Sequence, residues 1–149
     1  MDDKKRDKYL QKKYGITLAE YNTMVSAQGN GCAICGQEPR TRSLAVDHSH
    51  GLARAKIHVL QYENKEGFYA WVQWEEVRAL FKKTRVIGCS KKEVRIRVKE
   101  IRKRLSIRGL LCSRCNRGLQ YFSDTPQRLI SAANYLKRFK ERLEEGETT

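Results

Sequence analysis

The sequence lacks any long run of apolar residues. No stretch approaches the roughly 20 consecutive apolar residues that a membrane-spanning helix needs, so no membrane partner is expected. Residues 1–6 are charged and no apolar segment follows them, which argues against a secretory signal. Internal repeats and low-complexity segments are missing as well. From these absences we expect a protein of the reducing cytoplasm.

Acidic residues are few compared with basic ones. The chain has 17 aspartate and glutamate residues against 31 lysine and arginine residues, which gives a formal net charge of +14. A charge of this size attracts polyanions, so nucleic acid is the leading expected partner. The alternative is a basic surface that only keeps the protein in solution, and charge by itself does not separate DNA from RNA.

The length and the composition limit the fold. With 149 residues, 40% of them hydrophobic and 32% charged, the chain can build one compact domain with a modest core, or a small core that carries one insertion. We expect a single domain of the α+β class over residues 1–149. Because the core is modest, a further cross-link is expected to support it, and the cysteines indicate which one.

Hydrophobic periodicity predicts the individual elements. Thr17 and Glu20 form a capping-box pattern that starts a helix, and Gly29 and Gly31 end it. In chain order, the further elements are a strand over residues 44–48, a hairpin made of residues 55–62 and 67–74, a short helix over residues 75–83, and a helix over residues 90–105. Residues 94–98 also alternate like a strand, which leaves an alternative for the last of these.

A final helix is expected between Pro126 and Gly146. Asp124 or Thr125 would cap it, and Pro126 suits its first turn. Apolar residues recur on one face at helical spacing, and we expect this stripe to be buried in the core: Leu129, Ile130, Ala133, Leu136 and Leu143.

Two CxxC pairs indicate a metal site. In Cys32 to Cys35 and in Cys112 to Cys115, two intervening residues allow a tight turn that aims both thiolates at one tetrahedral ion. Four thiolates complete the coordination shell of zinc, so the role of the ion would be structural. The alternatives are independent redox pairs or buried free thiols, which a reducing compartment makes less favourable. Cys89 has no such neighbour and is interpreted as a small core residue.

Polar residues suited to hydrolysis lie between and beside these pairs. The motif Val46-Asp47-His48-Ser49-His50 follows the first pair, and Asn116 comes directly after Cys115. Carboxylate and amide oxygens are ligands suited to Mg²⁺, and a neutral histidine can act as a general base near pH 7. Each residue also has a structural alternative: Asp47 can cap a turn, the histidines can be surface residues, and Asn116 can stabilise its knuckle.

Four segments together carry a resemblance to a known family. They are Tyr14-Gly15-Ile16-Thr17-Leu18 with Tyr21, Cys32-Ala33-Ile34-Cys35-Gly36, Val46-Asp47-His48-Ser49-His50, and Arg108-Gly109-Leu110-Leu111-Cys112 followed by Cys115-Asn116. Over roughly residues 8–50 and 107–138, the chain resembles the recombination endonuclease VII family within the HNH, or ββα-metal, endonuclease superfamily.

The resemblance implies a fold and a set of roles. It implies a small ββα-metal core on a four-cysteine zinc site, in a bacterial or phage-encoded protein that cleaves double-stranded or branched DNA. Asp47 and Asn116 would hold a single catalytic Mg²⁺ or Mn²⁺ at the scissile phosphate, His48 would activate the attacking water, and His50 would contact the phosphate. The cation would neutralise charge that develops on the phosphate and the leaving oxygen, so no covalent intermediate is needed. A homodimer is left open.

The chain departs from the family pattern between the DHxH motif and the second knuckle. Family members usually connect these through a short hairpin loop, whereas this chain inserts most of residues 51–107, here called the basic insertion. Residues 82–108 carry most of the chain's excess positive charge. We expect an arm that docks DNA through phosphate contacts, made by Arg95, Lys99, Arg102, Lys103 and Arg108. A solvated helix whose charges only aid solubility is the alternative.

Two functions from different classes therefore compete. The first is a metal-dependent DNA endonuclease that uses Asp47, His48, His50 and Asn116. The second is a non-catalytic, zinc-dependent DNA-binding protein, which would not need these residues. Thiol redox chemistry is a third alternative, and it fails if the four cysteines bind zinc.

Overall fold

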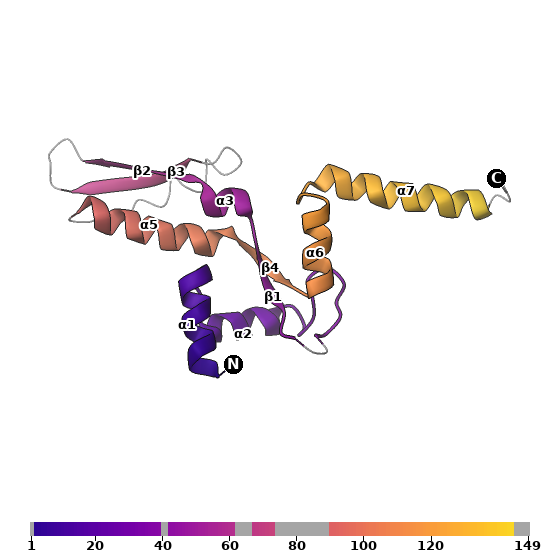
Figure 1. The fold of residues 1–149 in the computed structure, drawn as a ribbon, viewed down its shortest axis with the longest axis horizontal. Coiled ribbons are helices and arrows are strands. Elements are labelled where there is room, and N and C mark those ends of the chain that lie inside the picture. The colour runs from indigo at the N-terminus through magenta and orange to yellow at the C-terminus, as the bar shows by residue number, and fades with distance from the viewer. Residues whose placement is uncertain (1, 40–41, 62–66, 74–89, 145–149) are drawn as a thin grey trace.

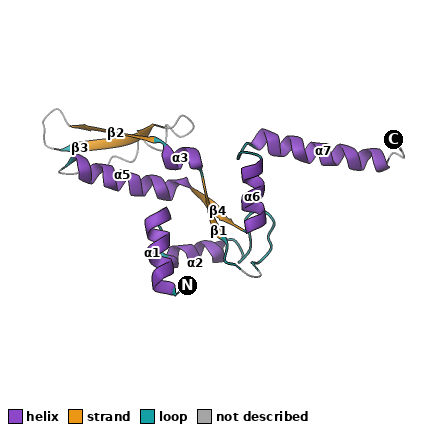
Figure 2. Cartoon of the chain, viewed as in Figure 1, coloured by secondary structure: helices purple, strands orange, loops and turns teal. Residues whose placement is uncertain are grey.

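The described part of the chain contains both helices and strands. The computed structural model describes residues 2–39, 42–61, 67–73 and 90–144. The mixture confirms the α+β class (Figure 1 and Figure 2). In chain order the elements are α1 (Asp3–Tyr14), α2 (Leu18–Ala27), β1 (Ala45–His48), α3 (His50–Arg54), β2 (Lys56–Gln61), β3 (Phe68–Gln73), α5 (Lys91–Ser106), β4 (Ile107–Leu111), α6 (Ser113–Tyr121) and α7 (Pro126–Glu144).

Local capping explains the two N-terminal helices. The Asp2 side chain accepts a hydrogen bond from the Lys5 N–H at the start of α1, and Gly15 ends the helix in the left-handed conformation, with φ 75°. The predicted capping box at the start of α2 is confirmed, because the Thr17 and Glu20 side chains each accept a hydrogen bond from the other's backbone N–H.

Strands β1 and β4 bring distant parts of the chain together. They pair antiparallel, with Val46 opposite Leu110 and Asp47 opposite Gly109, and the register shifts between Asp47 and His48. Helix α6 follows β4 directly. The main core cluster gathers around this pair and the N-terminal helices; its buried residues are Leu10, Ile16, Tyr21, Cys32, Leu44, Val46, Leu110 and Leu111. This β1–β4–α6 unit carries the candidate site.

The basic insertion has a second, smaller core. The predicted hairpin is confirmed by the antiparallel pairing of β2 with β3, and α5 packs against it (Figure 1). Its buried cluster comprises Leu52, Ala55, Ala70, Val72, Val94 and Val98. Residues 94–98 belong to the helix rather than to a strand, because Val94 and Val98 are buried while Ile96 is 53% exposed, as helical spacing requires.

The two ends of the basic insertion are connected to the main core at adjacent positions. Helix α5 ends at Ser106 and β4 begins at Ile107 without a loop between them. The Ser49 N–H donates a hydrogen bond of 2.8 Å to the Ser106 carbonyl, so the two ends of the inserted segment lie side by side. The predicted helix over residues 75–83 and the assignment of Cys89 to the core lie outside the described residues.

The C-terminal helix exists as predicted, but its predicted burial is wrong. Helix α7 has no buried residue, and Ile130, Leu136 and Leu143 are 58%, 67% and 59% exposed. Figure 1 shows α7 extending away from the other elements. Hydrophobic periodicity predicts that a helix has an apolar face, but it does not predict which element packs against that face. In the described part of this chain no element covers the apolar face of α7. Among the described helices, none combines the length and the apolar composition that crossing a membrane requires.

Gln28 links helix α2, the first cysteine loop and strand β4. Its Nε2 donates hydrogen bonds to the carbonyls of Gly31, at 3.0 Å, and Leu110, at 2.9 Å, while its Oε1 accepts from the Leu110 N–H at 2.8 Å. Leu110 is fully buried. The side chain therefore bonds the edge of β4 as a neighbouring strand would. Without it the Leu110 N–H and the Gly31 carbonyl would lose their partner, while the Leu110 carbonyl would keep the hydrogen bond from the Ala33 N–H.

We expect Gln28→Ala to lower the free energy of unfolding by about 2 kcal/mol, because it leaves the buried Leu110 N–H and the Gly31 carbonyl without a partner. Urea denaturation of the zinc-loaded protein measures this change. Gln11→Ala is the matched control, since the Gln11 amide donates an exposed hydrogen bond to Asp7 Oδ2, one turn away on α1. Equal losses in the two variants would contradict the structural role of Gln28.

Candidate metal centre and active-site cleft

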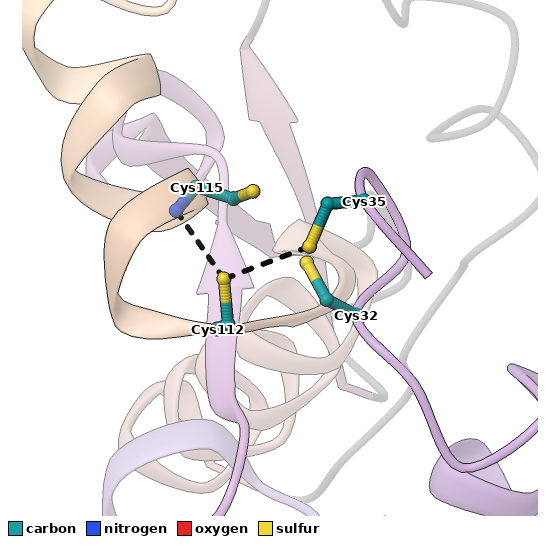
Figure 3. Close-up of side chains that lie close together, drawn as sticks. All are labelled: Cys32, Cys35, Cys112 and Cys115. Atoms are coloured by element: carbon teal, nitrogen blue, oxygen red, sulfur yellow. Dashed lines mark hydrogen bonds between the residues drawn. The ribbon is translucent and has the colours of Figure 1, made fainter. Parts of the chain in front are cut away.

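The four cysteines form one cluster. The Sγ atoms of Cys32, Cys35, Cys112 and Cys115 all lie within 4.8 Å of one another, and those of Cys35 and Cys112 are 3.9 Å apart (Figure 3). Thiolates around a tetrahedral zinc ion, at Zn–S distances of about 2.3 Å, would lie about 3.8 Å apart. The donor set and its spacing therefore fit zinc, as the CxxC spacing predicted.

Local backbone geometry supports both halves of the cluster. Cys112 caps α6, and its Sγ accepts a hydrogen bond of 3.5 Å from the Cys115 N–H. In the first knuckle, the Gly36 N–H donates to the Cys32 carbonyl at 2.8 Å. A Cβ at Gly31 would lie 2.1 Å from the Gly36 carbonyl oxygen, so only glycine allows this loop to close.

The thiols do not ionise equally. Burial opposes ionisation of Cys32, but backbone N–H groups around it outweigh burial and lower its pKa to about 6. At Cys115, burial and the neighbouring thiols raise the pKa to about 12. Four sulfur atoms this close cannot all carry negative charge without a cation between them. Zinc would supply that charge, and its binding would release the remaining protons.

We expect Cys35→Ser and Cys112→Ser each to lose most of the bound zinc and the cooperative unfolding transition, because a knuckle with one thiolate cannot close the shell. Elemental analysis and circular dichroism measure the two losses. Cys89→Ser removes the thiol that lies outside the two CxxC pairs of the sequence and should retain one zinc per chain. Full zinc content in either knuckle variant would contradict a tetrathiolate site.

A cleft next to this cluster brings the predicted catalytic residues together. It has a volume of about 640 Å³, and Asp47, His48, His50 and Asn116 all line it. Asp47 and His48 come from β1, His50 begins α3, and Asn116 lies in the first turn of α6. Because Asn116 follows Cys115 directly, the knuckle fixes the position of the helix turn that carries it.

Asp47 is buried and already has a partner. Its two carboxylate oxygens accept hydrogen bonds from Arg108 Nε and Nη2, both at 2.8 Å. The same Arg108 Nη2 donates to Asp124 Oδ2 at 3.1 Å. The hydrogen bond to Asp47 is the largest of the effects that raise the pKa of Arg108. Arg108 therefore lies beside the candidate site, paired with two carboxylates, while its side chain stays 38% exposed.

His48 lies where it can stay neutral. Burial lowers its pKa most, the nearby His50 and Lys13 lower it further, and Asp47 opposes these effects. Its ring meets Tyr14 edge-on, with the centroids 5.6 Å apart, and lies 4.7 Å from the His50 ring. With its pKa below the ordinary value of about 6.5, the imidazole is free to accept a proton at neutral pH.

Helix α1 contributes residues that the sequence analysis did not single out for the site. Arg6, Tyr9, Lys13 and Tyr14 line the same cleft. Lys13 Nζ donates a hydrogen bond of 2.9 Å to the Tyr9 hydroxyl and lies 5.1 Å from the centre of the Tyr14 ring. The signal that could have found them is their spacing of three and four residues, which puts basic and aromatic side chains on one helical face.

The predicted DNA-contact residues do not share one environment. Arg95 and Lys99 are exposed on α5. Arg102 donates to the Ala55 carbonyl, and Lys103 bonds both the Lys12 carbonyl, at 2.9 Å, and Glu100, at 2.8 Å. A second cleft of about 720 Å³ lies between α5 and the start of β2. Among the described residues that line it none is acidic, and its basic residues are Arg54, Lys56, Lys91, Lys92, Arg95, Lys99 and Arg102.

Comparison with known families assigns the chain. The family model of recombination endonuclease VII matches residues 7–138, so the chain belongs to that family. This confirms the resemblance on which the site residues were predicted, and it indicates a DNA endonuclease. No curated protein and no solved structure matches the chain.

Proposed function

We propose that this protein is a metal-dependent DNA endonuclease of the ββα-metal (HNH) type. The observation that carries the proposal is the single cleft lined by Asp47, His48, His50 and Asn116, beside four clustered thiols. The order of two antiparallel strands followed by a helix, β1–β4–α6, supports the ββα-metal assignment. Membership in the endonuclease VII family supports the substrate class.

The donor atoms in the cleft suit a hard divalent cation. Asp47 offers carboxylate oxygens and Asn116 an amide oxygen, which are ligands that Mg²⁺ and Mn²⁺ prefer. These two residues would hold one such ion, which when bound would neutralise charge on the scissile phosphate. Arg6 and Lys13 line the same cleft and can attract the phosphate backbone.

His48 is the general base of the proposed reaction. It takes a proton from a water molecule whose oxygen forms the new bond to phosphorus, while the bond from phosphorus to the leaving sugar oxygen breaks. His50, exposed at the start of α3, lies next to His48 and contacts the phosphate. Because water is the nucleophile, one hydrolysis step is enough and no covalent enzyme intermediate forms.

We expect His48→Ala to reduce the rate of DNA cleavage in Mg²⁺ or Mn²⁺ by at least about a hundredfold, because a positioned base contributes that factor or more. The wild-type rate should fall only below about pH 6.5, since burial lowers the pKa of His48 and keeps the base unprotonated above it. A panel of linear, nicked, supercoiled and four-way-junction DNA measures cleavage and substrate preference.

Two further measurements make this test decisive. His58→Ala removes a histidine of β2 that does not line the cleft and should cleave like the wild type. Zinc content and circular dichroism should be unchanged in both variants. Wild-type cleavage by His48→Ala would remove His48 from the role of base. DNA binding by the wild type without cleavage of any substrate would favour the alternative, a zinc-dependent DNA-binding protein.

The basic insertion docks the DNA in this proposal. Arg95, Lys99, Arg102 and Lys103 contact phosphates, and the cleft between α5 and β2 supports this role because its described lining gathers further basic side chains beside them. Helix α3 joins the two clefts, since it begins at His50 in the first and ends at Arg54 in the second. One DNA backbone can therefore contact both.

We expect replacement of Arg54, Lys92, Arg95 and Lys99 by glutamine to weaken DNA binding and to flatten its dependence on salt, because each lost phosphate contact lowers the slope by about 0.9. Fluorescence anisotropy over a range of salt concentrations measures both. The control replaces Lys137, Arg138, Lys140 and Arg142 on α7, which removes the same charge far from the cleft. Equal effects of the two sets would contradict a docking site on the insertion.

A homodimer is the assembly that we propose. The support is the exposed apolar face of α7, on which Leu136, Phe139 and Leu143 are 67%, 52% and 59% exposed. Exposed apolar faces of this kind mark interaction surfaces, and a second copy of the chain offers a matching one.

A further inference from the structure

Arg108 forms hydrogen bonds with the carboxylate of Asp47, which the proposed metal site needs as a ligand. Its guanidinium donates to both oxygens of Asp47, at 2.8 Å each, and Asp47 is only 7% exposed. A bidentate pair of this kind leaves no free oxygen facing the guanidinium. Asp47 therefore cannot hold a divalent cation with these same lone pairs while Arg108 stays in place.

Arg108 is not simply a permanent partner of Asp47, because a second carboxylate lies beside it. Asp124 Oδ2 accepts a hydrogen bond of 3.1 Å from Arg108 Nη2, but Asp124 Oδ1 is buried and has no hydrogen-bond partner among the described residues. A buried carboxylate oxygen without a donor is unfavourable. This oxygen could accept a second hydrogen bond if the guanidinium turned toward it.

The backbone keeps Asp124 in this position. Ser123 and Asp124 both adopt the left-handed conformation at the corner between α6 and α7, with φ of 55° and 54°. The Asp124 N–H donates to the Leu119 carbonyl at 2.9 Å, which fixes the corner to α6. Non-glycine residues rarely adopt this conformation, so the corner holds the carboxylate toward Arg108 at a cost in backbone strain.

We propose that Arg108 is a built-in counter-cation that neutralises Asp47 before a divalent cation binds and moves to Asp124 when one does. This inference rests on the proposed function, because it takes Asp47 as a metal ligand. Asp47 is then charge-paired in both states. Arg108 is a positioning residue here, because its place determines whether the Asp47 carboxylate is available to bind the metal ion. Its guanidinium pairs with Asp47 before the ion binds and with Asp124 afterwards.

The first test measures Mn²⁺ binding to the zinc-loaded protein without DNA, by the electron paramagnetic resonance signal of free Mn²⁺. In Arg108→Gln nothing competes for Asp47, so the dissociation constant should fall by about tenfold, the factor expected for one charge-assisted hydrogen bond. Lys13→Gln is the matched control, because Lys13 lines the same cleft but bonds Tyr9. Its loss of one positive charge should change the constant less.

The second test removes the alternative partner. Asp124→Asn should weaken Mn²⁺ binding several-fold, because the displaced guanidinium has no carboxylate to pair with. In the Arg108→Gln background the same substitution should have no effect, since the group that moves is absent. An electrostatic effect of the Asp124 charge alone would persist in that background. Glu141→Gln on α7 controls for the change in net charge.

The outcomes separate this inference from the proposed function. Asp47→Asn should abolish Mn²⁺ binding at the site; if it does, and Arg108→Gln binds Mn²⁺ no better than the Lys13→Gln control, the exchange is wrong while the metal site stands. An additive effect of Asp124→Asn in both backgrounds would also overturn the exchange. Unchanged Mn²⁺ binding in Asp47→Asn would reject the proposed metal site itself, and the exchange with it.

Discussion

The meeting of four thiols from the two ends of one long segment is the constraint on which the rest of the site depends. Cys32 and Cys35 follow α2, whereas Cys112 and Cys115 lie at the start of α6. One CxxC pair alone would fill only half of the coordination shell of a metal ion. A complete shell therefore requires the two ends of this segment to come together. The same closure sets β4 beside β1 and fixes the helix turn that carries Asn116 at the cleft that His48 also lines. The proposed zinc site and the proposed catalytic residues are thus joined through the backbone.

Local signals made much of the fold predictable. The capping box at Thr17, the hairpin of the basic insertion and the helix after Ser90 follow from side-chain spacing and turn residues, and the structure contains all three. Burial of the α7 stripe failed for a physical reason: periodicity defines a face on a helix and carries no information about what covers it. The alternation of residues 94–98 misleads in the same way, because a short apolar pattern fits two periods until packing selects one.

In the candidate site, too, some features could be predicted from the sequence and others could not. The clustering of the cysteines could be predicted because two residues between thiols impose one geometry. The Asp47, His48 and Asn116 group was found through motifs, and the family match supports the resemblance that carried them. The partners of these residues were not predictable. Arg108 was predicted to contact DNA, and its ion pair with Asp47 could not be read from the sequence, because it depends on the register of β1 against β4. The basic face of α1 was not predicted to belong to the site, because the sequence of a helix does not show which cleft its side chains line.

The hydrogen bond from Ser49 to Ser106 has a consequence for the architecture as a whole. A segment whose two ends are held together closes a loop, and doubling the length of such a loop costs only about 0.6 kcal/mol in chain entropy. The inserted segment is therefore connected to the β1–β4–α6 core at a single junction, whatever the length of the segment. Under the proposed function, the part of the chain that docks DNA can be enlarged or shortened beyond that junction while β1 and β4 keep their register.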